Sequence, residues 1–312
     1  MEQDYKMRPP LAYMETKTVS AKTKLFAILG DPILHCMSPV IMNASFRRLG
    51  LDNVFVAMRC DAAHIGVVME ALRVIDLGGY VITTPLKEIV TQYLDELCGE
   101  AKISGAVNCI QNSGGRLVGY NTDSMGFWSA IQEKNTGNGA ITVNKLFLFG
   151  MGGLAKAVAT QAAMQGVRNI AVVNRVEELA VIESFKAFSK KLCAEFPKVQ
   201  VNFLPWDSES WAPELADTDV VMNVTPIGLE TKGTLHVELP YEKTAQKAIF
   251  FDSPITFKSD FLLEAEARGH KVINGLDLNI HQGVYAFKIM TGLSVGYEEM
   301  RRDALEFIGW SP

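Results

Sequence analysis

The chain has 312 residues, of which 48% are hydrophobic and 21% are charged, and its formal net charge is −5. This length predicts one or two domains of about 100–200 residues each. The acidic balance, without clusters of Lys and Arg among aromatic residues, excludes a nucleic-acid-binding protein. No apolar run reaches the roughly 18 residues that a membrane span needs. Five cysteines without metal-ligand spacing argue against both a disulfide framework and a zinc site.

The N-terminal residues 1–23 have no apolar segment of the kind found in secretory signals. We therefore expect a flexible leader or an added helix, and a cytoplasmic protein. The first regular element is a predicted strand at 24–30, and a helix is predicted at 38–50. Ser38 is the expected N-cap of this helix, and Gly50 is expected to end it.

Short apolar segments then alternate with segments of helical periodicity. After the first helix, the predicted strands are NVFVAMRC (53–60), GGYVITTP (78–85), KLFLFG (145–150), NIAVVN (169–174), DVVMNV (219–224), KAIFFDS (247–253) and KVING (271–275). Strands that alternate with helices indicate the α/β class, with parallel sheets covered on both faces. The polar stretch 133–144, which has no periodicity, is the predicted link between two α/β lobes.

The segment FLFGMGGLAKAVA (147–159) passes from a buried strand into a helix through a turn with three glycines. This order is typical of a dinucleotide-binding fingerprint, in which backbone N–H groups and a helix N-terminus face a pyrophosphate. The candidate cofactor-binding residues of this turn are Gly150, Gly152, Gly153, Leu154 and Ala155. The alternative is a plain tight turn between a strand and a helix.

The next strand ends in Asn174 and Arg175, where many NAD-binding proteins have an acidic residue for the ribose 2′-hydroxyl. An arginine here neutralises a 2′-phosphate or stacks on adenine, which favours NADP. Glu177 and Glu178 follow at once and weaken this preference, although acidic residues are also common in the first turn of a helix. The cofactor therefore stays open between NADP, which Arg175 favours, and NAD.

Polar clusters follow several strand ends in the first half of the chain. Lys87 comes directly after a strand that ends in proline, and Asp123 stands in an NTD sequence further along. An ammonium group can give a proton to a developing alkoxide while a carboxylate orients it, so the two residues are candidates for a proton-transfer pair. The alternative for Lys87 is a solvated surface lysine.

Together with the glycine turn, these clusters resemble the motifs of the shikimate/quinate dehydrogenase family. The matching segments are GDPILHCMSP (30–39), VITTPLK (81–87), GAVNC (105–109), NTDSMG (121–126), NR (174–175), NVTPIG (223–228) and GL (275–276) ahead of Gln282. The resemblance runs from about residue 24 to about residue 295.

The resemblance implies two α/β lobes with a cleft between them. The expected parts are a leader at 1–23, a substrate-binding domain at 24–126 that helices at 278–312 complete, and a Rossmann dinucleotide-binding domain at 127–277. It also implies reversible hydride transfer between a nicotinamide and a ring alcohol or ketone of shikimate, quinate or a related cyclic acid. Such a reaction belongs to aromatic or specialised metabolism, and no metal is expected.

The resemblance also implies roles for particular residues. Lys87 and Asp123 would be the acid/base pair, and Asn108 and Gln282 would hold ring hydroxyls. Cys36, Ser38 and Thr83 would face the carboxylate side of the substrate. The cofactor-binding residues beyond the glycine turn would be Asn174, Arg175, Asn223, Thr225, Pro226 and Gly275.

Four residues depart from the family pattern. Cys36 replaces a serine, Met42 a histidine, Val81 an asparagine and Ile255 a tyrosine. A pocket that has lost polar partners rejects a polar ligand, because buried groups of that ligand stay unpaired. We therefore expect a small cyclic alcohol or ketone other than shikimate itself as substrate.

A second hypothesis is a dinucleotide-binding sensor or scaffold that has the same fold and no turnover. The retained Lys87 and Asp123 favour the enzyme, since a sensor needs no proton-transfer pair. The expected partner is thus a small molecule, with neither nucleic acid nor membrane, and the expected state is a monomer or homodimer.

Overall fold

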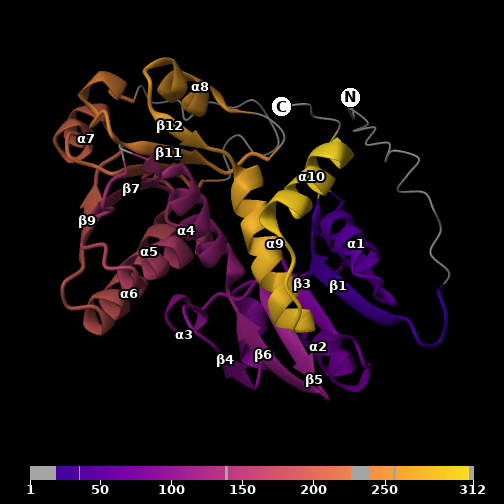
Figure 1. Cartoon of the computed structure of the whole chain (residues 1–312). Coiled ribbons are helices and arrows are strands. Elements are labelled where there is room, and N and C mark those ends of the chain that lie inside the picture. Colours follow the sequence, from indigo (N-terminus) through magenta and orange to yellow (C-terminus); the bar gives the residue numbers. More distant parts are fainter. Residues whose placement is uncertain (1–18, 35, 138–139, 226–238, 256–257, 309–312) are drawn as a thin grey trace, which may run out of the picture. The chain divides into compact units, whose positions relative to one another are not determined.

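The computed structural model describes residues 19–34, 36–137, 140–225, 239–255 and 258–308 (Figure 1). By their contacts these residues form two compact units, each with one six-stranded sheet. We call them the first lobe (described residues of 1–98, 107–122 and 283–312) and the second lobe (described residues of 99–106 and 123–282). The prediction of an α/β protein with two lobes is confirmed.

The first lobe has a mixed sheet with the strand order β2-β1-β3-β5-β6-β4. Its strands are β1 (Lys24–Gly30), β2 (Asn53–Arg59), β3 (Gly79–Ile82), β4 (Glu96–Leu97), β5 (Cys109–Ser113) and β6 (Arg116–Tyr120). Its helices are α1 (Ser38–Arg48), α2 (Ile65–Val74), the 3₁₀ helix η2 (Ile89–Tyr93), α10 (Tyr297–Ile308) and the last part of α9 (Gly275–Thr291). Strand β1 pairs in parallel with both β2 and β3.

Strand β5 runs antiparallel to both of its neighbours, so the expectation of purely parallel sheets was wrong for this lobe. Strands β5 and β6 form a hairpin in which Ser113 pairs with Arg116. Between them lie Gly114 and Gly115, with φ angles of 59° and 88°. A two-residue hairpin turn with both φ angles positive matches the twist of the strands, and glycine adopts it without strain. The two glycines therefore allow the chain to reverse here.

Helix α1 starts one residue earlier than the sequence suggests. Ser38 is its first helical residue and Met37 is the N-cap, which makes no side-chain capping bond, so the prediction of Ser38 as N-cap was wrong. Met37 is buried. At the other end, Gly50 has a φ of 65° and its N–H binds the carbonyl of Arg47 at 3.0 Å. Gly50 thus ends the helix as expected.

The C-terminal helices complete the first lobe (Figure 1). On α1, Arg48 forms an ion pair with Asp303 of α10 and lies 3.9 Å from Glu299 of the same helix. The ring of Phe46 on α1 lies 5.4 Å, between centroids, from the ring of Phe287 on α9. The end of the chain therefore covers a helix from near its beginning.

The second lobe has an all-parallel sheet with the strand order β12-β11-β10-β7-β8-β9. Its strands are β7 (Lys145–Phe149), β8 (Asn169–Val173), β9 (Gln200–Leu204), β10 (Val220–Asn223), β11 (Ile249–Asp252) and β12 (Lys271–Ile273). Its helices are α3 (Ala101–Ser104), α4 (Thr122–Lys134), α5 (Gly153–Met164), α6 (Leu179–Glu195), α7 (Ser208–Leu215), η4 (Tyr241–Lys243), α8 (Asp260–Ala267) and the first part of α9. Numbered from β7, this order is 3-2-1-4-5-6, that of a Rossmann fold.

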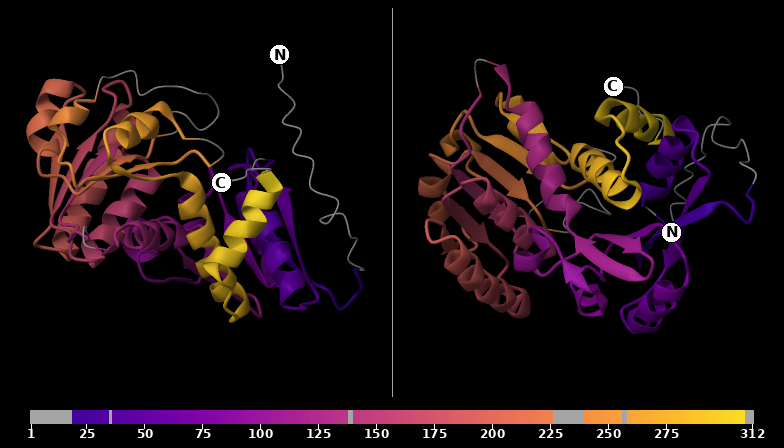
Figure 2. Two further views of the ribbon diagram at one scale, coloured as in Figure 1. Left: turned by 45° about the horizontal axis from the view of Figure 1, so that its top comes forward. Right: turned by 60° about the horizontal axis from the view of Figure 1, so that its bottom comes forward.

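Helices cover both faces of this second sheet (Figure 1, Figure 2). Leu146 and Leu148 of β7 pack in one apolar cluster with α4, α5 and α6, whereas Phe147 and Phe149 pack in another with α7 and α8. Successive side chains of a strand point to opposite faces, so a strand covered on both faces is apolar throughout. This explains why KLFLFG shows no alternation of polar and apolar residues.

The polar stretch 133–144, predicted to link the lobes, lies inside the second lobe. The side chain of Asn135 makes two hydrogen bonds with the backbone of Ile141, at 2.6 and 2.7 Å. The N–H of Asn144 binds a carboxylate oxygen of Asp219 at 2.8 Å. Polar composition marked this segment as a loop, but it carries no information about which lobe the loop packs on.

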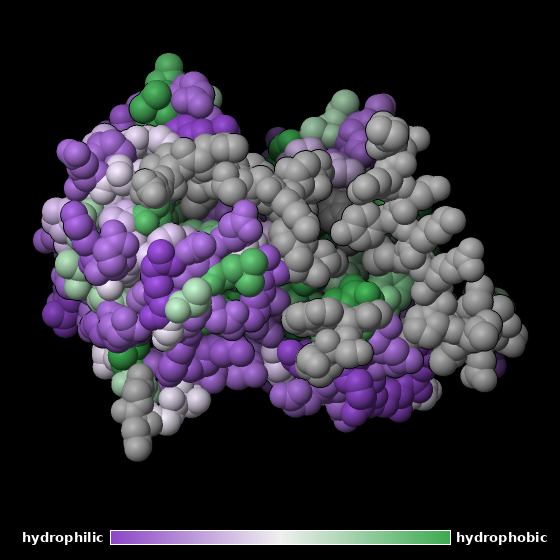
Figure 3. Space-filling model, turned by 90° about the horizontal axis from the view of Figure 1, so that it is seen from above, coloured by the Kyte–Doolittle hydropathy of each residue, from purple (hydrophilic) through white to green (hydrophobic). Residues whose placement is uncertain are grey.

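The surface of the described residues is largely polar on the face that Figure 3 shows, where hydrophobic residues lie in small separate areas. No helix within the described ranges is both long and apolar enough to cross a membrane.

Candidate functional site

Four segments that carry predicted substrate residues meet at one edge of the first-lobe sheet. Strands β1 and β3 are parallel and both end there, at Gly30 and Ile82. Strand β5 is antiparallel and begins there at Cys109, which pairs with Tyr120 at the end of β6. The loops after β1, β3 and β6 and the residue before β5 therefore lie at the same edge.

The loop after β1 lies beside the loop after β3. The N–H of Asp31 binds the carbonyl of Thr84 at 3.0 Å. Thr83 lies against Gly30, where an added Cβ would come within 2.3 Å of the threonine methyl group. Gly30 thus permits the close approach that puts Thr83 next to the first loop. Ser38, at the start of α1, is buried behind this loop.

Cys36 and Lys87 are electrostatic neighbours in these two loops. Burial raises the pKa of the Cys36 thiol to about 11, and the positive charge of Lys87 opposes this rise. Because such an effect falls off with distance, the ammonium lies near the thiol. The backbone carbonyl of Lys87 accepts a hydrogen bond from the N–H of Val107 at 2.8 Å, which ties its loop to the segment before β5.

Asn108 holds the start of helix α4. Its Oδ1 accepts the backbone N–H of Thr122 at 2.6 Å, and its Nδ2 lies 3.0 Å from Thr122 Oγ1. Asn108 is only 2% exposed. Asp123 follows Thr122 directly in the first turn of α4. Asn108 therefore fixes the backbone that presents Asp123, a contact that sequence reasoning did not anticipate.

A buried carboxyl group, Glu100, lies near Asp123. Burial raises the pKa of Glu100 well above its usual range, and the charge of Asp123 raises it further. The hydroxyls of Ser104 and Ser124 lie close enough to oppose the rise, but neither meets the geometry of a hydrogen bond to the carboxylate oxygens. Sequence reasoning missed Glu100, because its position before a short helix looks like that of any surface glutamate.

Gln282 lies on α9, where this helix crosses α4. It is 4% exposed. A Cβ on Gly126 would come within 2.6 Å of the Gln282 backbone nitrogen and 2.8 Å of the Leu278 carbonyl, so only glycine permits this crossing. The glycine of the NTDSMG motif is thus explained by helix packing. Gly275, predicted to bind cofactor, has a similar role, since its Cβ would lie 1.9 Å from the carbonyl oxygen of Ser253.

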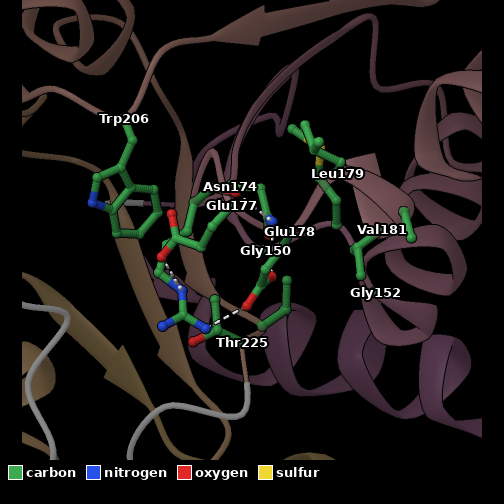
Figure 4. Close-up of a pocket in the computed structure, with 13 residues that line it drawn as sticks. Gly150, Gly152, Asn174, Glu177, Glu178, Leu179, Val181, Trp206 and Thr225 are labelled. Carbon is green, nitrogen blue, oxygen red and sulfur yellow. Dashed lines mark hydrogen bonds and ion pairs between the residues drawn. The ribbon is translucent and has the colours of Figure 1, made fainter. Parts of the chain in front are cut away.

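The second lobe has a cavity of about 520 Å³ at the carboxyl ends of β7, β8 and β10 (Figure 4). The strand order reverses at β7, and ligands of open α/β sheets bind where the order reverses. Residues that line it include Gly150, Gly152, Asn174, Arg175, Trp206 and Thr225. Five of these six residues, all except Trp206, are among the eleven predicted cofactor residues.

The glycine turn forms one wall of this cavity. Gly150 has a φ of 108°, and its Cβ would meet the Thr225 side chain at 2.9 Å. Gly152 is the N-cap of α5, and a Cβ on it would meet no atom within 4 Å. Gly153 and Leu154 begin α5, and Ala155 is fully buried behind them. Gly150 is therefore required by the fold, whereas at Gly152 the protein itself leaves space.

Asn223 shapes the loop that follows β10. Its Nδ2 donates to Asp252 at 2.9 Å, and its Oδ1 accepts from the N–H and the hydroxyl of Thr225, at 3.1 and 2.6 Å. Burial raises the pKa of Asp252 to about 6, although hydrogen bonds from Ser259, Ser253 and Asn223 oppose the rise. Asn223 thus orients Thr225 toward the cavity. The next predicted residue, Pro226, lies outside the described residues, as does His35.

Arg175 lines the cavity and has two carboxylates beside it. It forms an ion pair with Glu178, and its Nε lies 4.0 Å from Glu177. Glu178 also accepts a hydrogen bond from Asn174 Nδ2 at 2.8 Å. These two bonds lower the pKa of Glu178, with the larger effect from Asn174.

Trp206 is a cavity residue that sequence reasoning missed. It comes two residues after β9, the third strand of this Rossmann half, and it lines the same cavity as Arg175 (Figure 4). The signal was present in the sequence VNFLPW, because the strand order puts the end of this strand beside the adenosine end of the cofactor site.

Comparisons with known proteins agree with this geometry. Residues 28–110 match the family model for the shikimate dehydrogenase substrate binding domain. A shikimate dehydrogenase (NADP(+)) of Desulforamulus reducens is 32% identical, over 91% of this chain and 95% of its own length. One of Methanocaldococcus jannaschii is 32% identical over 93% and 99%. The structure of shikimate 5-dehydrogenase from Listeria monocytogenes, in complex with shikimate and NAD, has a TM-score of 0.81 at 29% identity, covering 92% of this chain and 98% of that one.

Proposed function

The chain belongs to the shikimate/quinate dehydrogenase family, and from this premise we propose that it is an NAD(P)-dependent oxidoreductase acting on a ring CH–OH group. It transfers a hydride reversibly between a nicotinamide and a ring carbon of shikimate, quinate or a related cyclic substrate. The observation that carries the proposal is the glycine-lined cavity of the second lobe, at the point where the strand order reverses.

The cavity fits a dinucleotide. The empty space beside Gly152 and the N-terminus of α5 suit a pyrophosphate, because the backbone N–H groups there have no helical partners. Arg175 and Trp206 suit the adenosine end, by charge and by stacking. The bound nicotinamide supplies or accepts the hydride.

The residues of the chain handle the proton that accompanies the hydride. In the direction of ketone reduction, the ammonium of Lys87 gives a proton to the ring oxygen as the carbonyl becomes an alcohol. In the reverse direction the neutral amine takes that proton back. Asp123 is the carboxylate that orients Lys87, and Asn108 and Gln282 hold ring hydroxyls. The bond of Asn108 to the backbone just before Asp123 and the charge that Lys87 exerts at Cys36 support a common site for these residues.

The substrate is a cyclic compound that needs fewer polar contacts than shikimate. The loops around Ser38 and Thr83 would face its carboxylate side, and there Cys36 offers a neutral thiol, a weaker hydrogen-bond donor than a hydroxyl. Val81, in the central part of the sheet, offers no donor at all. This supports a substrate other than shikimate of the central pathway.

The test is a cofactor assay with the full chain. NADPH or NADH is mixed with dehydroshikimate, dehydroquinate and a panel of neutral cyclic hydroxyketones, and the nicotinamide absorbance is followed. We expect oxidation of cofactor with at least one ketone, and its loss in the Lys87→Ala variant. Binding of cofactor without turnover on any ketone would favour the silent scaffold, and binding of neither dinucleotide would contradict the proposal.

A further inference from the structure

Glu178 is held by the two residues that follow strand β8. One carboxylate oxygen is paired with Arg175, and the other accepts the amide N–H of Asn174 at 2.8 Å. Two bonds to neighbouring residues fix the carboxylate at the cavity wall (Figure 4). A side chain that is held in this way is already oriented before a ligand arrives.

The place of this carboxylate is informative. In a sheet of this order, the end of the second strand lies beside the adenosine ribose, and an acidic residue there accepts the 2′-hydroxyl. Strand β8 is that second strand, and its last residue, Val173, is followed by Asn174 and Arg175. The sequence has no Asp or Glu directly after this strand, but the fold places the Glu178 carboxylate beside Asn174 and Arg175, at the same strand end.

The charge of the cavity wall also depends on this residue. Arg175 is the one basic side chain among the described residues that line the cavity, and Glu177 and Glu178 line it too. A 2′-phosphate carries close to two negative charges near neutral pH. To pair with Arg175, the phosphate would have to break the ion pair between Arg175 and Glu178, and it would then remain beside the Glu178 carboxylate. Binding of a 2′-hydroxyl requires neither.

We propose that Glu178 sets the cofactor preference of this protein, by accepting the ribose 2′-hydroxyl of NAD and by holding Arg175 back from the 2′-phosphate of NADP. The inference rests on the proposed function and makes it more specific. The protein uses both cofactors, and its preference for NADP is smaller than Arg175 alone would give.

Glu177 supplies a matched control. It is the neighbouring acid on the same cavity wall, yet its side chain is 66% exposed, compared with 33% for Glu178, and it lies 4.0 Å from Arg175 Nε. Water screens an exposed charge at this distance. A general effect of negative charge would be the same for both glutamates, whereas the proposed role belongs to Glu178 alone.

The experiment measures dissociation constants of NAD⁺ and NADP⁺ by calorimetry for the full chain and for its Glu178→Gln and Glu177→Gln variants. Loss of a charged hydrogen-bonding group changes affinity by roughly 10- to 100-fold. We expect Glu178→Gln to bind NADP⁺ about tenfold more tightly and NAD⁺ several-fold more weakly. Glu177→Gln should change either constant by less than about threefold.

Two further variants test the mechanism. Arg175→Ala should weaken NADP⁺ much more than NAD⁺. In the double variant Arg175→Ala with Glu178→Gln, the gain in NADP⁺ affinity from Glu178→Gln should be smaller, because no guanidinium is present to bind the 2′-phosphate. Glu178 makes no side-chain capping bond to α6, so these proteins should fold normally, which circular dichroism checks. Glu178→Ala serves as a second variant that also removes the charge.

The outcomes separate this inference from the proposed function. Equal changes for both cofactors in Glu178→Gln, or equal effects of Glu177→Gln and Glu178→Gln, would overturn the role of Glu178 while dinucleotide binding stands. A wild-type protein that binds neither cofactor would overturn both proposals.

Discussion

Lys87 is the residue on which the proposed proton transfer depends. We expect Lys87→Ala to lower kcat by roughly 10²–10⁴, because general acid catalysis contributes a factor of this size. The dissociation constant for cofactor should not change, since Lys87 belongs to the first lobe and the cofactor cavity lies in the second. Steady-state kinetics and calorimetry test the two expectations separately.

Lys24 is a suitable control for this variant. It lies in the same lobe at the start of β1, is partly exposed, and pairs only at the surface with Asp76. Lys24→Ala should leave kcat unchanged. A near-normal kcat in Lys87→Ala would remove this residue from the chemistry.

Cys36 and Val81 are the residues that should set substrate choice in the first lobe. We expect the wild-type protein to oxidise shikimate about 10²–10⁴ times less efficiently than its relatives, because two weakened contacts to a charged group have an effect of that size. The double variant Cys36→Ser with Val81→Asn should recover part of this efficiency, measured as kcat/KM for shikimate.

The change at Val81 can also lower the stability of the protein. Val81 is 4% exposed, and a buried amide without partners costs about 1–3 kcal/mol, so thermal unfolding must accompany the kinetics. Full shikimate oxidation by the wild-type protein would show that these residues do not limit activity. If the double variant folds and gains nothing, Ile255 becomes the dominant change.

The glycine turn between β7 and α5 gives a prediction at the scale of an element. Gly150→Ala should destabilise the second lobe by about 1–2 kcal/mol or more, because its φ of 108° disfavours any Cβ and Thr225 leaves no room for one. Gly152→Ala should leave stability nearly unchanged, because no atom lies within 4 Å of its added Cβ.

Cofactor affinity, unlike stability, should depend strongly on Gly152. Gly152→Ala fills the space expected for the pyrophosphate, so its affinity for NADP⁺ should fall at least tenfold while it stays folded. Thermal unfolding and calorimetry on both variants check this. An unchanged affinity in Gly152→Ala would mean that the cofactor does not approach this backbone.

Elements were more predictable from the sequence than their contacts were. Most strands of the second lobe could be predicted, because continuous apolar runs such as KLFLFG are typical of strands covered on both faces. Strand β9 was missed, because its residues are partly or largely exposed and its sequence QVNFL is not a continuous apolar run. The hairpin at Gly114 and Gly115 was missed, although paired glycines between short apolar segments indicate such a turn. The start of α1 was misplaced by one residue, because a serine before a helix suggests a side-chain cap that this helix does not have.

Within the candidate site, the motifs predicted where polar residues gather but not what they contact. Asn108 and Asn223 were assigned to ligands, yet their described bonds hold Thr122 and the Thr225 loop in place. The pairing of Arg175 with Glu178 could be foreseen from their spacing. The approach of Glu100 to Asp123 could not, because it arises from packing between segments that no local pattern connects.

At the scale of the whole molecule, Asp252 should make stability depend on pH. Its folded pKa of about 6 lies above the value of about 3.9 expected in the unfolded chain. The folded protein therefore holds a proton that the unfolded chain has lost between about pH 4 and 6, and stability falls as the pH rises through this window. Above it the cost stays constant, at about 3 kcal/mol.

Asp252→Asn should remove this cost. The amide oxygen can accept from Asn223 and Ser253 as Oδ1 does now, and the amide nitrogen can donate to the hydroxyl of Ser259. We expect a higher melting temperature than wild type at pH 8 and little difference near pH 4. Glu100, whose pKa is also raised, should leave a slope of the same sign in this variant. Equal destabilisation at both pH values would show that the hydrogen bonds need the carboxylate.

The return of residues 283–312 to the first lobe has a consequence for synthesis. A ribosome adds about 5–20 residues per second. The residues of the second lobe are therefore complete before Asp303, the ion-pair partner of Arg48, has been synthesised. The lobe that begins first is thus finished last. Until then the ring of Phe46 has no contact with that of Phe287, and the side of α1 that α10 covers is exposed to water and to other chains. We therefore expect the second lobe to fold first during synthesis, and the first lobe to finish folding only after residues 283–312 have been made.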